Sequence, residues 1–358
     1  MSNGFEIDFL PVGEGERCGD AITLRWREGD RYRVMVYDGG TADYGAKLVT
    51  HIRKYFGTDH VDYVVNSHPD NDHAGGLSHV VNTMSVGEVW LHRPWEYSSQ
   101  ILQYFHDGRI TDASLAERLQ EKMSAAHDLE QAARKRSIPV NEPFAGSKIG
   151  IFTVLSPMKD RYVHDLIPAF EKSPKLAQES LAKAAVDYGR KAFQFVADKW
   201  DVEYLPDSVA TSAENESSAI LFGSYNEHGI LLTGDAGIES LKAAADFATN
   251  LGIHLPSVVT FVQIPHHGGR HNMSTSSLNI LIGEPRPLNH ETRKRSAYAS
   301  ASAKAPSHPK RVVTNAFIRR GFNVAQTKGR SIRYSKNMPA RADYSKLNYL
   351  PFYDEVEG

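Results

Sequence analysis

Cysteine is almost absent from this sequence, with Cys18 as the single example among 358 residues. One thiol cannot build an internal disulfide framework or a cysteine-based zinc cage. Long apolar runs are absent too, and no stretch approaches the roughly 20 residues that a membrane-spanning helix requires. The opening residues, MSNGFEIDFLPVGEG, lack the basic and apolar regions of a signal peptide. We therefore expect a cytoplasmic protein with no membrane partner.

An excess of charge of either sign is also missing, because 41 Lys and Arg nearly balance 43 Asp and Glu. Bulk charge therefore gives no reason to expect a polyanion binder. The basic C-terminal part, about residues 285–346, is the exception, since fifteen basic residues accompany only Glu291 and Asp343. Such a surface could bind the phosphates of a nucleic acid, or it could be a solvated face that balances the rest of the chain. The candidate nucleic-acid contacts are Arg293, Lys294, Arg295, Lys310 and Arg311, with Tyr298, Phe317, Phe322 and Tyr334 as stacking or core aromatics.

The chain reads as one elaborated α/β domain over residues 1–358. Short strand patterns punctuated by glycine turns begin at FEIDFL, AITLRW, YRVMVYD and VDYVVNS and resume at KIGIFTVLSP, SSAILFGS, HGILLTGDAG and SVVTFVQIP. Two stretches rich in Ala, Glu, Lys and Leu, about 97–136 and 164–200, predict helical insertions outside a sheet core. Near the end, KRVVTNA, FNVAQT and SIRYS predict strands, and SAYASASAKAPSHP predicts a loop.

The densest polar cluster follows the apolar segment VDYVVNS. In HPDNDHAGG, four ligand-type residues, His68, Asp70, Asp72 and His73, fall within six positions. Imidazoles and carboxylates of one loop can converge on a point, and this mixture without thiolates suits Zn, Mn or Fe, with carboxylate-rich sites favouring Mn. The competing interpretation is a polar turn in which Asp70 or Asp72 caps the next helix.

Further ligand candidates favour the metal site, because they follow other predicted strands. They are Asp235 in LLTGDAG, His266 and His267 in IPHHGG, and His308 in APSHPKR. Two cations about 3.5 to 4 Å apart need a bridging carboxylate and ligands from several loops. Asp235 is the preferred bridge, and the sequence predicts two divalent metal ions, Zn or Mn.

The motif HPDNDHAGG resembles the His-x-His-x-Asp-His signature of metallo-β-lactamase-fold hydrolases, with Asp70 in place of the second histidine. Together with FLPVGEGERCGDAI, VYDGG, VLSP, ENESSAILF, LLTGD, PHHGG and a later HP, it resembles the hydrolase domain of ComEC-type DNA-uptake proteins and their stand-alone relatives. The resemblance runs from about Phe5 to Tyr334. Longer helical insertions, a longer first glycine turn and a glycine where the family usually has serine after HHG depart from that pattern.

The resemblance implies an αββα sandwich of two mixed sheets flanked by helices, with the metals at one edge of the sheets. By family position, His68 and Asp70 would bind the first metal and Asp72 and His73 the second. Asp235 would bridge them.

Other family positions are less complete. His308 would be a further ligand of the second metal, and Asn215 stands where many such enzymes have a third histidine for the first metal. Weak occupancy of the first site is therefore expected. We favour His267 as ligand or oxyanion contact and His266 as its support, with Asp38 as a further supporting position.

The chemistry implied is hydrolysis, because two metals lower the pKa of a water that Asp72 is placed to orient. The basic C-terminal part favours a nuclease or nucleotide phosphodiesterase. Two alternatives stay open: a small-molecule hydrolase of thioester or lactone type, and a metal-stabilised binding or regulatory module that has lost turnover. Protein partners cannot be named from the sequence.

Overall fold

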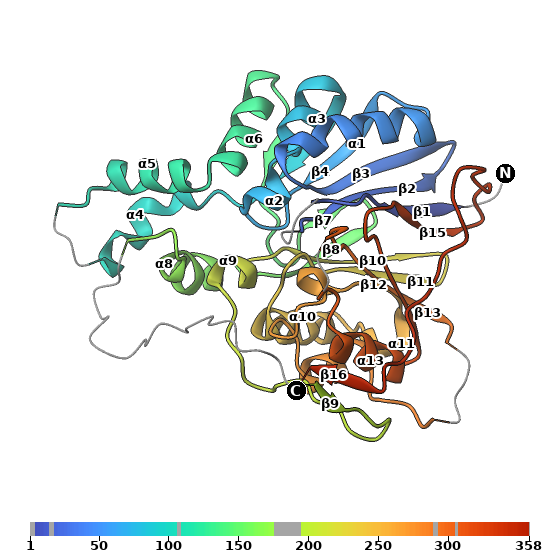
Figure 1. Cartoon of the computed structure of the whole chain (residues 1–358). Helices are drawn as coiled ribbons and strands as arrows, with labels where there is room; N and C mark the ends of the chain where they lie inside the picture. Colours follow the sequence, from blue (N-terminus) through green and yellow to red (C-terminus); the bar gives the residue numbers. More distant parts are fainter. Residues whose placement is uncertain are drawn as a thin grey trace.

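The computed structural model describes residues 4–13, 18–105, 109–174, 195–288, 293–304 and 307–357. Two seven-stranded mixed sheets pack face to face, and helices cover both outer faces (Figure 1). The predicted αββα architecture is thus confirmed. Among the described helices, none combines the length and apolar character needed to cross a lipid bilayer.

The first sheet has the order β15-β1-β2-β3-β4-β5-β6. Its sequence-adjacent strands β1 to β3 pair antiparallel, whereas β3, β4, β5 and β6 run parallel. The bounds are β1 (Phe5–Phe9), β2 (Ala21–Glu28), β3 (Arg31–Gly39), β4 (His60–Val65), β5 (Ser85–Trp90), β6 (Val140–Asn141) and β15 (Ile332–Lys336).

The second sheet has the order β14-β13-β12-β11-β10-β8-β7. Here β11 to β14 run parallel, and β7, β8, β10 and β11 pair antiparallel. The bounds are β7 (Lys148–Ile149), β8 (Phe152–Ser156), β10 (Ile220–Tyr225), β11 (His228–Leu232), β12 (Val259–Gln263), β13 (Arg295–Ala299) and β14 (Phe322–Gln326); β9 (Phe195–Ala197) and β16 (Glu355–Glu357) form a separate ribbon.

Helices shield the outer face of each sheet. In Figure 1, α1, α3 and α6 lie over the first sheet, and α10, α11 and α13 lie over the second. The α-helices are α1 (Gly45–His51), α2 (Asn71–Ala74), α3 (Leu77–Thr83), α4 (Ser98–Ile101), α5 (Asp112–Lys122), α6 (Ser124–Lys135), α7 (Lys159–Arg161), α8 (Ile167–Ala169), α9 (Ala213–Glu216), α10 (Ile238–Asn250), α11 (Leu255–Val258), α12 (Thr275–Ile282) and α13 (Arg311–Arg319). Short 3₁₀ or π turns complete them at Ala42–Tyr44, Ile52–Phe56, Pro94–Tyr97, Leu102–Tyr104, Tyr162–Leu166 and Pro265–Gly268.

The core between the sheets contains a cluster of aromatic rings among aliphatic side chains. Phe9 packs edge-on against Tyr298, and Phe261 stacks on Tyr334 with ring centroids 4.7 Å apart. Because these rings are buried, Tyr298 and Tyr334 are core residues and do not offer stacking surfaces to bases. Phe317 and Phe322 are buried in the core beneath the second sheet as well.

Two predictions near the C-terminal end are wrong. The segment KRVVTNA forms the start of α13, because Val312, Val313, Ala316 and Phe317 recur with helical spacing and bury one face against the sheet. The segment SAYASASAKAPSHP begins with β13, a buried strand between β12 and β14. Its small side chains gave no alternating pattern, since a central parallel strand is buried on both faces.

The two predicted helical insertions fare differently. Residues 97–136 contain α4, α5 and α6 with 106–108 outside the described residues, and α6 packs on α3. In the second, about 164–200, the described helix α8 ends at Ala169 and β9 stands at 195–197, whereas residues 175–194 lie outside the described residues. Figure 1 places α4, α5 and α8 at the end of the sandwich that also carries α2 and α9.

Candidate metal centre

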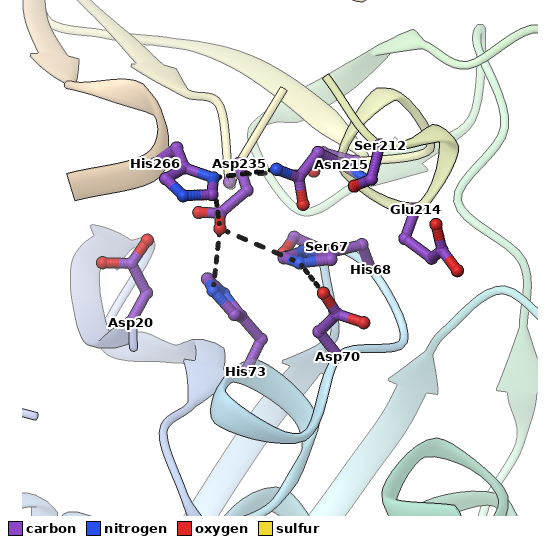
Figure 2. Close-up of polar contacts among 12 residues, drawn as sticks. Asp20, Ser67, His68, Asp70, His73, Ser212, Glu214, Asn215, Asp235 and His266 are labelled. Carbon is purple, nitrogen blue, oxygen red and sulfur yellow. Dashed lines mark hydrogen bonds and ion pairs between the residues drawn. The ribbon is translucent and has the colours of Figure 1, made fainter. Parts of the chain in front are cut away.

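Loops from both sheets meet at one edge of the sandwich. Strands β3 and β4 run parallel, so Asp38 at the end of β3 lies beside the loop that follows β4 and carries His68. In the second sheet, β11 leads to Asp235 and β12 leads to His266 and His267. The carboxyl ends of parallel strands share one edge of a sheet, which is why residues so distant in sequence converge. Figure 2 shows His68, His73 and His266 arranged around Asp235.

Asp38 organises the first-sheet half of the site. Its carboxylate accepts hydrogen bonds from the backbone N–H of Ser67 at 2.7 Å, the Ser67 hydroxyl at 2.6 Å and Nδ1 of His73 at 2.8 Å. Asp38 adopts a left-handed backbone conformation with φ of 58°, which is uncommon outside glycine. Both oxygens of Asp38 are thus engaged by Ser67 and His73, which suits a residue that orients His73.

Asp235, which follows β11 of the second sheet, lies close to several histidines. Its Oδ2 lies 3.1 Å from Nδ1 of His266, 3.4 Å from Nε2 of His73 and 4.0 Å from Nε2 of His68. The backbone of Asp235 is fixed by the Ser218 hydroxyl, which accepts from its N–H at 3.1 Å. The structure therefore brings the preferred bridging carboxylate to both halves of the predicted site.

Buried polar atoms without partners provide the test of whether this set suits a metal. Among the described residues, Nε2 of His68, Nε2 of His73, Oδ1 of Asp235 and Nδ1 of His267 are buried and make no hydrogen bond. Buried polar groups are otherwise nearly always paired. Nitrogen and carboxylate donors of this kind suit Zn or Mn, so the residues fit a divalent cation.

In the part of the chain that the structure describes, three groups of ligand-type side chains have donor atoms within 4.8 Å of one another. One group combines Asp72 with His73 and His267, which brings together the three residues assigned to a second metal or to catalysis. The other groups are Asp38, His68 and His73, and Asp20, His73 and Asp235.

Asp20 was not among the predicted site residues. It is buried, its carboxylate contacts Nε2 of Gln263, and the Gln263 Oε1 accepts from the backbone N–H of Thr233 and Gly234. Burial raises the pKa of Asp20 to about 7. The segment CGDAI matches a family position near the site, but Asp20 was set aside because an aspartate beside a glycine is also common in ordinary turns.

The two adjacent histidines occupy strained backbone. His266 has φ of 46° and His267 has φ of 57°, and Gly268 continues with φ of 83°. Left-handed conformations of such residues cost roughly 1–3 kcal/mol each and cluster at functional sites. A Cβ at Gly268 would come within 2.3 Å of Pro309, so glycine is required where the His308 loop passes this turn.

The histidines differ in charge because their surroundings differ. Burial disfavours the charged forms of His73 and His266, but the carboxylate of Asp235 outweighs it and raises both pKa values. Burial lowers the pKa of His267 to about 3. His267 is therefore a neutral imidazole near pH 7, the form that binds metals.

A cavity of about 570 Å³ opens beside these residues. It is lined by Asp70, Asn215, His266 and His308 together with Glu171, Thr211, Ser212, Gly269, Arg270, His271, Asn272 and Lys310. Asn215 Nδ2 lies 2.8 Å from Nδ1 of His266, so Asn215 contacts the first of the two adjacent histidines (Figure 2). His308 reaches the cavity but belongs to none of the ligand groups found among the described residues.

The loop after β4 does not act as a helix cap. Asp70 stands at the N-cap position of α2, yet its side chain makes no capping hydrogen bond. One of its oxygens faces Nε2 of His68 at 3.6 Å, and the other contacts the ammonium group of Lys172. The metal interpretation of this loop is thus favoured over the capping interpretation, and Lys172 is a neighbour that sequence reasoning missed.

The basic C-terminal part is less exposed than its composition suggested. Arg295 was proposed to contact nucleic acid, but it is buried and donates to the carbonyl of Ile282 at 2.7 Å, so that assignment is wrong. Arg319 and Arg320 are also buried and pair with Asp198 and Glu203.

The other four candidate contacts are placed differently. Lys310 is buried but lines the cavity. Arg311 and Lys294 are exposed and Arg293 is half-buried. The guanidinium of Arg311 lies over the rings of Phe195 and Tyr353.

A family model matches the part of the chain that carries the first-sheet residues of this site. Residues 29–143 match the Metallo-beta-lactamase superfamily. The matched segment includes Asp38, His68, Asp70, Asp72 and His73. Its agreement with the ligand groups described above supports a divalent metal centre.

Solved structures with low similarity were also found. The metallo-β-lactamase fold protein YhfI from Bacillus subtilis is 9% identical with a TM-score of 0.41, covering 93% of this chain and 100% of that one. A metallo-β-lactamase from Hirschia baltica is 12% identical with a TM-score of 0.34, covering 80% and 95%. The dizinc quorum-quenching lactonase AidC is 11% identical with a TM-score of 0.32, covering 66% and 69%. The comparison with curated proteins gave no match.

Proposed function

We propose that this protein is a metal-dependent hydrolase that cleaves a phosphodiester bond in a nucleic acid or nucleotide. The observation that carries the hydrolase proposal is the set of buried, unpartnered donor atoms on His68, His73, Asp235 and His267. Such a set is costly to bury unless a cation completes it. The finer resemblance to ComEC-type hydrolase domains supports the choice of substrate.

Bound divalent ions would lower the pKa of water and stabilise the charge that develops on the attacked group. The chain's own residues have distinct tasks around them. His68 and Asp70 would hold one ion, Asp72, His73 and His267 the other, and Asp235 both. The carboxylate of Asp72, which is only half-buried, would also orient the attacking water.

The cavity beside the site supports an anionic substrate. Arg270 and Lys310 line it, and both carry cationic groups suited to phosphate oxygens. The hydroxyl and amide groups of Ser212, Asn215 and Asn272 add neutral hydrogen-bond partners. A phosphodiester placed there would have its scissile group next to His266 and Asp70.

A second candidate, a small-molecule hydrolase acting on a lactone or thioester, has its own supporting observation. The cavity of about 570 Å³ has the size typical of small-molecule sites. Moreover, burial of Arg295, Arg319 and Arg320 removes three cations from the surface that would bind a polymer.

The test is hydrolysis by purified protein supplied with Zn or Mn. Labelled single-stranded DNA, duplex DNA, RNA and dinucleotides should be compared with a lactone and a thioester. Asp235→Asn removes the bridging charge, and Asp30→Asn makes the same chemical change on an exposed side chain far from the site.

Cleavage of a phosphodiester by wild type and Asp30→Asn, with loss in Asp235→Asn, would support the proposal. Turnover of only the lactone or thioester would assign the second candidate. Metal binding without turnover of any substrate would favour the binding or regulatory module.

A further inference from the structure

Among the described residues, Lys172 is the one lysine or arginine seen in an ion pair with a predicted metal ligand. It lies in the turn after α8, and its ammonium group contacts Oδ1 of Asp70. Both side chains are about 30% exposed, so the pair lies at the mouth of the site. A lysine ammonium has no lone pair and cannot itself bind a metal.

The backbone around Lys172 is held from several sides. Its N–H donates to Oε1 of Glu214 at 3.3 Å, and its carbonyl accepts from Nε of Arg118 at 3.2 Å. The next residue, Ser173, donates its hydroxyl to the carbonyl of Ile167 at 2.7 Å. Contacts from α5 and α9 thus fix the position from which the side chain reaches Asp70.

The two oxygens of Asp70 serve different neighbours. Oδ1 contacts Lys172, whereas Oδ2 faces the unpartnered Nε2 of His68 at 3.6 Å. A cation between Asp70 and His68 would therefore lie a few ångströms from an ammonium group. Like charges at such separations repel, and a carboxylate that is already paired attracts a second cation less strongly.

Charge compensation explains why the aspartate is accompanied by this lysine. Asp70 brings a negative charge to a position where the metallo-β-lactamase motif has a neutral histidine, and Lys172 cancels that charge. The other ligand group consists of Asp72, His73 and His267. In the described part of the chain, no Lys or Arg is seen to pair with its carboxylate, Asp72, as Lys172 pairs with Asp70. The two halves of the centre thus differ in their electrostatic surroundings.

We propose that Lys172 weakens cation binding by His68 and Asp70, so that the two metals of the centre bind with unequal affinity. This inference rests on the proposed metal centre. Lys172 is a tuning residue and acts through the carboxylate of Asp70. Filling of the first position then requires a higher concentration of free metal than filling of the second.

The experiment is a Zn titration of the metal-free full chain against a chromophoric chelator, with bound Zn counted by elemental analysis. Lys172→Met removes the charge and keeps an unbranched side chain, whereas Lys172→Arg keeps the charge. Lys54→Met is the matched control, because Lys54 pairs with the exposed Asp343 at 2.6 Å away from the site.

We expect wild type, Lys172→Arg and Lys54→Met to show one tight and one weak Zn site. In Lys172→Met the weak site should tighten by about tenfold or more, which lies within the usual range of effects of residues that contact metal ligands. Thermal unfolding of the metal-free variants checks that each one folds.

Two other outcomes have separate meanings. Equal or weaker first-site affinity in Lys172→Met would overturn the inference and identify the lysine as a group that orients Asp70. A wild-type chain that binds no Zn or Mn would overturn the proposed metal centre itself.

Discussion

The carboxylate of Asp38 accepts a hydrogen bond from Nδ1 of His73 at 2.8 Å, and both side chains are fully buried. This bond leaves Nε2 of His73 facing Asp235 and the interior of the site. The tautomer and the ring orientation of a metal-binding histidine are commonly set in this way. Asp38 thereby connects the end of β3 to a ligand on α2.

Asp38→Asn tests this positioning role. Both oxygens of the Asp38 carboxylate accept hydrogen bonds from Ser67 and His73, whereas an amide has one oxygen that accepts and one nitrogen that donates. His73 should therefore lose its fixed orientation. We expect Zn affinity to fall by about 10- to 100-fold with little change in the number of sites. A chelator competition titration measures it, with Asp30→Asn as control, and unchanged affinity would refute the role.

Metal removal should lower the stability of the protein. A ligand that binds only the folded chain adds about 2.7 kcal/mol to the free energy of unfolding at a concentration of 100 times its Kd. Urea unfolding with Zn and with a chelator measures this difference. Asp235→Ala should respond far less, and an equal response would mean that the added Zn binds elsewhere.

His92 predicts a pH dependence of stability. Its ring stacks on Tyr162, and neither ring nitrogen has a hydrogen-bond partner in the described structure. Burial lowers its pKa from 6.5 to about 3, so as the pH falls below 6.5 the unfolded chain takes up this proton first. The folded state should therefore lose about 1.4 kcal/mol for each pH unit between 6.5 and about 3.

His92→Phe removes this titration and keeps an aromatic ring beside Tyr162. The loss of unfolding free energy between about pH 7.5 and about pH 5 should then be roughly 2 kcal/mol smaller than in wild type. Denaturant unfolding at both pH values gives the comparison. Equal losses in the two proteins would show that His92 is not neutral and buried in the native state.

Arg319 tests the structural role of the basic C-terminal part. Its guanidinium contacts Asp198 at 2.6 Å and donates to the carbonyl of Trp200 at 2.9 Å, all within the interior. Arg319→Met leaves Asp198 as an unpaired buried charge, which should cost about 3–5 kcal/mol of unfolding free energy. Lys328→Met, on an exposed turn, should change it by less than about 0.5 kcal/mol. Similar effects of both substitutions would contradict the burial of Arg319.

Local patterns were sufficient for much of the fold and for the ligand loops. The run from Val61 to Ser67 predicted a buried strand, and the ligand-type residues after it predicted the loop that the structure places at the sheet edge. The same reasoning linked Asp235 and the His266–His267 pair to the ends of other strands. Each of these signals lies within a few residues of a strand end.

What could not be predicted depends on contacts between distant parts of the chain. Lys172 lies in a turn whose sequence gives no sign of Asp70, and Asp20 reaches the site only because two sheets pack together. Composition alone suggested that Arg295 and Arg319 were surface cations. It could not show that Arg295 donates to a buried carbonyl or that Arg319 pairs with Asp198 inside the protein. The segment that forms α13 was predicted as a strand because its adjacent valines favour strands. It is a helix because packing against the sheet buries one helical face.

The ligand groups come from both sheets, with His68 and His73 on one and Asp235 and His267 on the other. A bound ion would therefore add coordination bonds to the contacts that already join the two sheets along this edge, among them the hydrogen bond from the Ala219 N–H to the Ser67 carbonyl and the contact between Asp20 and Gln263. Pulling the sheets apart would require the coordination bonds to break. The rigidity of the two-sheet sandwich would then depend on how much metal is available. The chain's resistance to proteolysis should therefore report the free metal concentration around it.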